Sequence, residues 1–131
     1  MKKVLVCAVL LVVGGLFGLA SQMLAADKGP AELTLQSTMD PAKTPKPATF
    51  PHGAHQARLE CKTCHHGKGT DGKRIPYHDG QKIEKCETCH NSKASMPAKV
   101  NTFKNAAHAL CQECHRKNKA ELVKCTVCHT K

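Results

Sequence analysis

Cysteine and histidine recur together at four places between residue 61 and residue 129. Each place holds two cysteines separated by two residues, with a histidine directly after the second cysteine. The four units are Cys61-Lys62-Thr63-Cys64-His65, Cys86-Glu87-Thr88-Cys89-His90, Cys111-Gln112-Glu113-Cys114-His115 and Cys125-Thr126-Val127-Cys128-His129. This spacing lets two thiols add to the vinyl groups of one haem while the histidine reaches its iron, so the pattern is typical of c-type haem attachment. Four copies predict four covalently bound haems.

The same cysteines permit two other interpretations. Pairs of Cys-x-x-Cys also build zinc sites, and eight cysteines in an exported chain could form four disulfides. Neither arrangement requires a histidine after every second cysteine. The histidines therefore favour haem.

The number of histidines bears on what the haems do. Nine are present, and four of them belong to the units. The other five are His52, His55, His66, His78 and His108. If four of these fill the sixth coordination positions, no iron is open to a substrate, and electron transfer is the expected function. The alternative is an enzyme with one open haem, such as a metal or oxyanion reductase.

The positions of the spare histidines predict that the haems lie close together. His66 directly follows His65 and cannot turn to the far face of the same iron, so it would bind a neighbouring one. His108 lies three residues before the third unit and should likewise serve a different iron. His52 and His55 are one helical turn apart on one face, which suits two haems that pack together. A compact cluster follows.

His78 is the surplus histidine. It lies in a loop, residues 67–80, that is rich in glycine. Two interpretations stay open at this stage. His78 is either an exposed side chain or a ligand that displaces one of the other four.

The elements that must position these residues are expected to be small. After the first 26 residues the aromatic side chains are only Phe50, Tyr77 and Phe103. So few large apolar side chains cannot offset the conformational entropy of folding, and the cofactors must form the core. We expect a mostly irregular single domain wrapped around a four-haem cluster. Short helices are predicted around the third and fourth units, within residues 101–117 and 119–129, with little or no sheet.

The N-terminus predicts export. Residues 1–26 have a basic start, an uncharged apolar run and small residues at the end, which is typical of a cleaved signal peptide. An uncleaved membrane anchor is the alternative, and Cys7 is read as a passenger. Residues 27–48 are expected to form an extended proline-containing segment, and residues 49–131 the tetrahaem domain. The expected product is a periplasmic monomer with no stable membrane insertion.

The chain is strongly basic, with 20 Lys and Arg residues against 10 Asp and Glu residues and a formal net charge of +10. Nucleic acid is not expected as a partner of an exported protein. Haem propionates would offset part of the charge. A cluster around the fourth unit is either an ordinary solvated face or a docking patch for an acidic protein. It consists of Arg116, Lys117, Lys119, Lys124 and Lys131.

From about residue 48 to the C-terminus, the sequence resembles the class III cytochromes c, the tetrahaem cytochrome c3 family. The segment Phe50-Pro51-His52-Gly53-Ala54-His55 and the double histidine after Cys64 carry this resemblance most specifically. Many members have four residues between the cysteines of the second and fourth units, where this chain has two. The resemblance implies four axial pairs. They are His52 with His65, His66 with His90, His55 with His115, and His108 with His129.

The resemblance also implies a role. It is that of a periplasmic low-potential electron carrier in the anaerobic respiration of sulfate- or metal-reducing bacteria. The implied donor is a hydrogenase or a formate dehydrogenase, and the implied acceptor is a membrane-bound or multihaem cytochrome complex.

Overall fold

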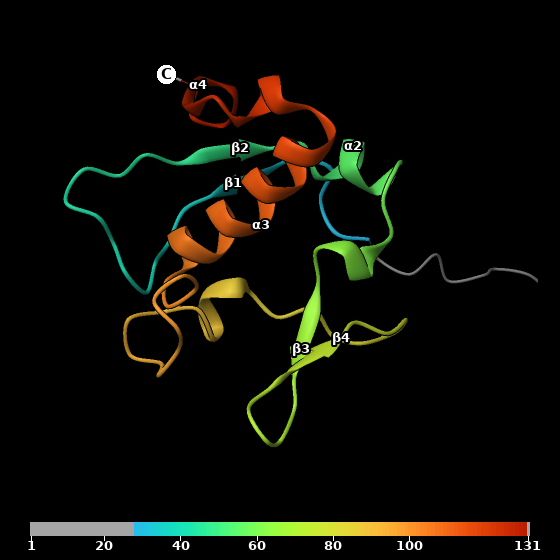
Figure 1. Cartoon of the computed structure of the whole chain (residues 1–131), viewed down its shortest axis with the longest axis vertical. Coiled ribbons are helices and arrows are strands. Elements are labelled where there is room, and N and C mark those ends of the chain that lie inside the picture. The colour runs from blue at the N-terminus through green and yellow to red at the C-terminus, as the bar shows by residue number, and fades with distance from the viewer. Residues whose placement is uncertain (1–27, 131) are drawn as a thin grey trace, which may run out of the picture.

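The computed structural model describes residues 28–130, so the predicted signal peptide, Cys7 and Lys131 lie outside the described residues. Short elements are joined by long irregular stretches (Figure 1). The strands are β1 (Leu33–Leu35), β2 (Ala48–Phe50), β3 (His66–Lys68) and β4 (Arg74–Pro76), and the α-helices are α2 (His52–Gln56), α3 (Phe103–Asn118) and α4 (Cys125–Cys128). Three 3-10 turns span Cys61–Thr63, Cys86–Thr88 and Ala120–Val123. The predicted fold class of a small, mostly irregular domain with a few short helices is confirmed.

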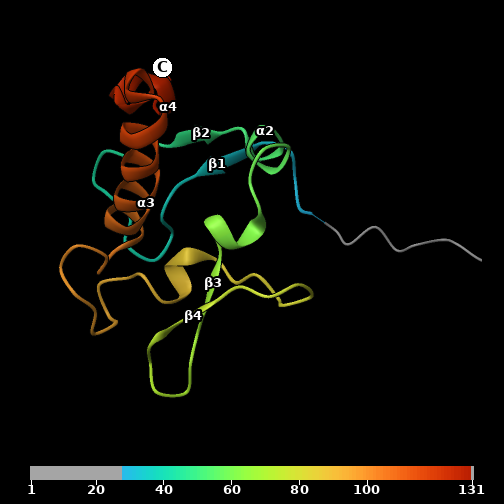
Figure 2. The ribbon, with the colours of Figure 1, turned by 45° about the vertical axis from the view of Figure 1, so that its right-hand side comes forward.

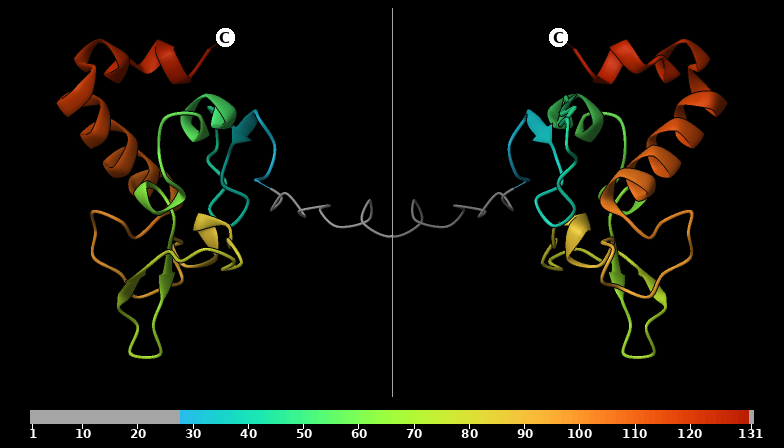
Figure 3. Two further views of the ribbon diagram at one scale, coloured as in Figure 1. Left: turned by 90° about the vertical axis from the view of Figure 1, so that its right-hand side faces the viewer. Right: turned by 90° about the vertical axis from the view of Figure 1, so that its left-hand side faces the viewer.

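Two antiparallel strand pairs make up the sheet of the described residues. In the first, Leu33 lies opposite Phe50, so the chain before the first unit folds back on itself. In the second, His66 lies opposite Pro76, and Gly72 takes a φ of 81° in the connecting turn. The β3–β4 hairpin points away from α3 and from the β1–β2 pair, as Figures 2 and 3 show.

Helix α3 is the one long element of residues 28–130. It starts at Thr102, whose hydroxyl accepts a hydrogen bond from the backbone N–H of Asn105 at 3.2 Å, a standard N-terminal cap. His115, Arg116 and Lys117 lie in its last turn, where positive charge complements the helix dipole. The helix packs against the 3-10 turn at Ala120–Val123. The sequence predicted a short helix within residues 101–117, and the structure has a helix of 16 residues over Phe103–Asn118.

Side chains do not form an apolar core in the described part of the chain. No hydrophobic residue there is buried, and the buried side chains are those of Glu87, His90 and Asn91. Six large apolar side chains are instead exposed, among them Ile83 at 46%. Without buried apolar side chains, these residues cannot be stabilised by the burial of side chains against one another. Within residues 28–130, no helix is long and apolar enough to cross a membrane.

Candidate haem sites

Eight of the nine histidines lie in four close pairs. The ring centres are 6.2 Å apart for His52 and His65, 5.9 Å for His66 and His90, 6.2 Å for His55 and His115, and 6.0 Å for His108 and His129. A histidine nitrogen lies about 2 Å from a bound metal ion, so two rings that face one ion from opposite sides have centres about 6 Å apart. Each pair therefore leaves room for one iron. The pairs are the four that the family resemblance implies.

Backbone carbonyls orient most of these rings. In six of the eight rings, Nδ1 lies within 3.3 Å of a backbone carbonyl oxygen. The ring and carbonyl partners are His52 with Pro30 (3.0 Å), His55 with Pro51 (2.9 Å), His66 with Gly67 (3.1 Å), His90 with Val100 (2.7 Å), His115 with Leu122 (3.3 Å) and His129 with Pro47 (2.9 Å). A carbonyl can only accept, so Nδ1 donates its hydrogen and Nε2 keeps a free lone pair. This is the usual arrangement of a metal-binding histidine.

His65 is half-buried and has a lowered pKa. Burial is the main cause, and the neighbouring His52 and His66 add to it because they disfavour a second positive charge. The neutral ring is the form that binds a metal ion. His65 is therefore held in the protonation state that ligation needs.

Each Cys-x-x-Cys-His unit that the hydrogen bonds describe forms a single helical turn. The backbone N–H of His65 donates to the carbonyl of Cys61 at 2.8 Å, and His90 and His129 repeat this bond to Cys86 and Cys125. A helical turn places residues three and four apart on one side. The two sulfurs and the imidazole of a unit thus face the same way, as attachment to one haem requires. In α3 the same spacing adds His108 to the face of Cys111 and His115.

Cysteines of all four units lie close enough for their charges to act on the pKa of the Cys111 thiol. No disulfide joins any of the eight cysteines of residues 28–130. Burial, and after it the negative charges that Cys64, Cys128 and Cys86 would carry, raise the pKa of the Cys111 thiol to about 11. These residues belong to the other three units, so the units converge around α3. No group of three or more His, Cys, Asp or Glu residues among the described residues forms a metal-ion site of the zinc type.

A cavity of about 560 Å³ lies at the fourth unit, between α3, α4 and the stretch before β2. Its lining includes the histidine pair His108 and His129, the cysteines Cys125 and Cys128, and Pro47 and Lys124. Most of the lining surface is apolar. The residues of the fourth unit therefore fit a bulky, mainly apolar group bound through sulfur and imidazole.

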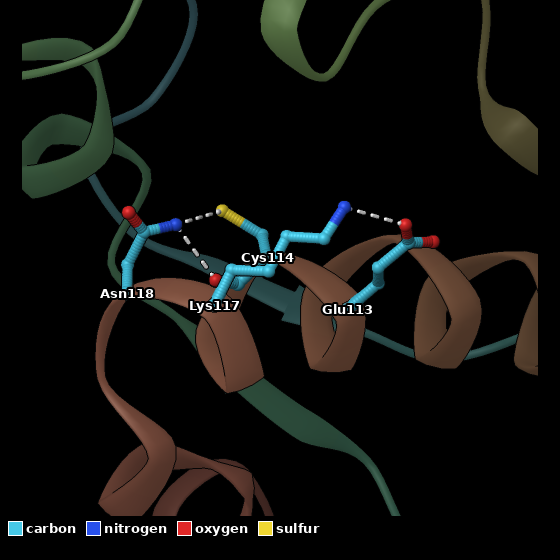
Figure 4. Close-up of polar contacts among 4 residues, drawn as sticks. All are labelled: Glu113, Cys114, Lys117 and Asn118. Atoms are coloured by element: carbon cyan, nitrogen blue, oxygen red, sulfur yellow. Dashed lines mark hydrogen bonds and ion pairs between the residues drawn. The ribbon is translucent and has the colours of Figure 1, made fainter.

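Polar contacts surround Cys114 on the last turns of α3 (Figure 4). The Nδ2 atom of Asn118 donates to the carbonyl of Cys114 at 2.8 Å and lies 3.7 Å from its sulfur. Lys117 pairs with Glu113 at 2.9 Å on the exposed side of the helix. Asn118 was missed at the sequence level, although its four-residue separation from Cys114 on a helix could have indicated it.

His78 joins none of the four pairs. Its side chain is exposed, and its ring centre lies 6.5 Å from that of Tyr77. Tyr77 in turn lies 6.3 Å from His65. Of the two interpretations of His78, the exposed side chain matches its position in the structure.

Glu87 is a second residue that sequence reasoning missed. It is buried inside the second unit and accepts hydrogen bonds from residues 37–39. No local pattern could have indicated it, because its partners lie 48 to 50 residues earlier.

The comparison with known families agrees with this geometry. The model of the class III cytochrome C family matches residues 30–131 of the chain. No curated protein matches the chain. The matched range contains all four units and all eight paired histidines.

Proposed function

Since the chain belongs to the class III cytochrome c family of multihaem electron-transfer proteins, which are not enzymes, we propose that it carries four haems, each held between two histidines. The eight cysteines of the four units attach the haems, and the histidine pairs bind the irons. The observation that supports this most directly is the spacing of the four pairs, all between 5.9 and 6.2 Å.

The chain's own residues set the chemistry. A bound haem iron supplies a centre that gains and loses one electron. Two imidazoles on each iron leave no coordination position for a substrate, which favours electron transfer over catalysis. The carbonyls of Pro30, Pro47 and Val100 make their histidines more basic by accepting the Nδ1 hydrogen. More basic ligands stabilise the more highly charged form of the iron, so a low potential is expected.

The proposal extends to location and partners. Residues 1–26 act as a signal peptide, residues 27–48 as an extended segment and residues 49–131 as the tetrahaem domain of a periplasmic monomer. It takes electrons from a hydrogenase or formate dehydrogenase and gives them to a membrane-bound or multihaem complex during sulfate or metal respiration. The exposed basic residues Arg116, Lys117, Lys119 and Lys124 near the fourth unit support docking to an acidic redox protein.

The test is to produce the full chain in a host that attaches c-type haem. The mass of the purified protein and its haem content should give four haems per chain, and the spectrum should be low-spin and unchanged by carbon monoxide. Replacing Cys86 and Cys89 by alanine together should remove one haem. A wild-type protein with fewer than four haems, or with an iron that binds carbon monoxide, would contradict the proposal.

A further inference from the structure

The carboxylate of Glu87 is the most enclosed acidic group of the described residues. The side chain is 8% exposed. It accepts hydrogen bonds from the backbone N–H groups of Thr38 at 2.7 Å and Met39 at 3.1 Å. The hydroxyls of Thr38 at 2.9 Å and Ser37 at 3.3 Å complete the set. Three of these donors reach Oε2 and one reaches Oε1, and all four come from one short stretch of chain.

No cation neutralises this carboxylate in residues 28–130. The four ion pairs found there involve Glu60, Asp71, Glu84 and Glu113, whose side chains are all more than half exposed. Glu87 is stabilised by neutral donors instead, an arrangement that holds an anion by backbone dipoles. The hydrogen bonds from Thr38 hold the pKa of Glu87 below its usual range. The group therefore carries a full negative charge at neutral pH, and no positive charge cancels it.

The charge lies within the second haem-binding unit. Glu87 stands between Cys86 and Cys89, and the Asn91 amide donates to its carbonyl at 2.8 Å. On the other side of His90, Asp40 accepts hydrogen bonds from the backbone and hydroxyl of Ser92. Loss of hydration raises the pKa of Cys86, and the charge of Glu87 raises it further. The field of the carboxylate thus reaches a sulfur that attaches the haem.

We propose that Glu87 is a positioning residue that fixes a permanent negative charge beside the second haem and thereby lowers the reduction potential of that haem. The proposal rests on the proposed function, because it needs a haem at this unit. A nearby negative charge in a weakly screened environment favours the form of the iron with the higher positive charge. The other three units contain no buried acidic residue in the described chain.

The experiment follows the four haems separately by NMR during stepwise reduction of the full-length holoprotein. The variant that lacks Cys86 and Cys89 identifies the signals of the second haem. Glu87→Gln is expected to raise the potential of that haem and to leave the other three nearer their wild-type values. Glu113→Gln is the matched control, since it removes a carboxylate from the third unit. The Glu113 side chain is 56% exposed and paired with Lys117. It should leave all four potentials near the wild type, because exposed charges are screened.

A second pair of variants separates charge from loosening of the structure. Thr38→Ala removes one hydroxyl donor but keeps the carboxylate and both backbone donors, so no rise is expected. Thr38→Lys places a positive charge against the carboxylate and should raise the potential of the second haem, even if Glu87→Gln does not assemble. An unshifted second haem in Glu87→Gln, or an equal rise in Thr38→Ala and Thr38→Lys, would overturn the proposal. A wild-type protein without four low-spin haems would instead overturn the proposed function.

Discussion

His66 and His90 lie with their ring centres 5.9 Å apart, although the rest of the β3–β4 hairpin and residues 77–89 separate them in sequence. His66 belongs to β3, directly after the first unit, while His90 closes the second. Two adjacent residues thus belong to two different candidate haem sites, since His65 faces His52 and His66 faces His90. This relationship makes the strongest prediction about coordination.

Replacing His66 by alanine should open one of the four irons. We expect a high-spin component of about a quarter of the haem, together with carbon monoxide binding that the wild type lacks. The absorption spectrum with and without carbon monoxide measures this. His78→Ala is the control from the same region, and its spectrum should match the wild type. Carbon monoxide binding in His78→Ala would show that His78 is a ligand.

The planes of the paired rings predict different paramagnetic resonance signals. His55 and His115 are nearly parallel, with an interplanar angle of 27°, whereas His52 and His65 are nearly perpendicular at 83°. Two parallel imidazoles split two of the iron d orbitals in energy, whereas two perpendicular imidazoles leave these orbitals almost equal in energy. The perpendicular pair therefore gives the more anisotropic signal. The oxidised protein should therefore show two classes of low-spin signal at low temperature. A single class would contradict the ring orientations.

The stability of the protein should depend on the charge of Glu87 in acid. Its pKa is lowered by the hydrogen bonds from Thr38, against an ordinary value of 4.5. A carboxyl group whose pKa is lowered in the folded state stabilises the fold at pH values above its ordinary pKa. This stabilisation is lost as the pH falls through the folded-state pKa. The melting temperature of the wild type should thus fall more steeply below pH 4.5 than that of Glu87→Gln. Parallel curves for the two proteins would contradict this.

The N-terminal cap of α3 gives a separate stability prediction. Thr102→Ala removes the acceptor for the backbone N–H of Asn105 and should lower the free energy of unfolding by about 1 kcal/mol. Denaturant unfolding of the holoprotein measures the loss. Thr102→Ser keeps the hydroxyl and should restore most of the wild-type value. If alanine and serine behave alike, the cap does not contribute.

Local features of this fold could be predicted from the sequence. The composition around the third and fourth units predicts helices where α3 and α4 lie, with the start of α3 within two residues of the predicted one. The constraint on His66 predicts that it meets the histidine of another unit, because neighbouring side chains cannot face one iron from both sides.

The partners of the N-terminal segment could not be predicted. The carbonyl of Pro47 accepts the Nδ1 hydrogen of His129 from 82 positions away, and that of Pro30 serves His52. Every residue has a carbonyl, so no side-chain pattern marks the ones that a histidine will use. Glu87 and its partners in residues 37–39 are also far apart in sequence. In the sequence, Glu87 looks like any exposed glutamate of a short turn.

The exposed apolar side chains and the lack of a buried one have an evolutionary consequence. In most domains, substitutions are restricted by the need to fill a tightly packed interior. Here, within residues 28–130, no apolar side chain is packed against others in an interior, so the expected restriction is the fit to the haems that we propose as the core. A library of single substitutions should therefore be least tolerant at the cysteines and the paired histidines, and related sequences can diverge elsewhere while they keep the same arrangement of ligands.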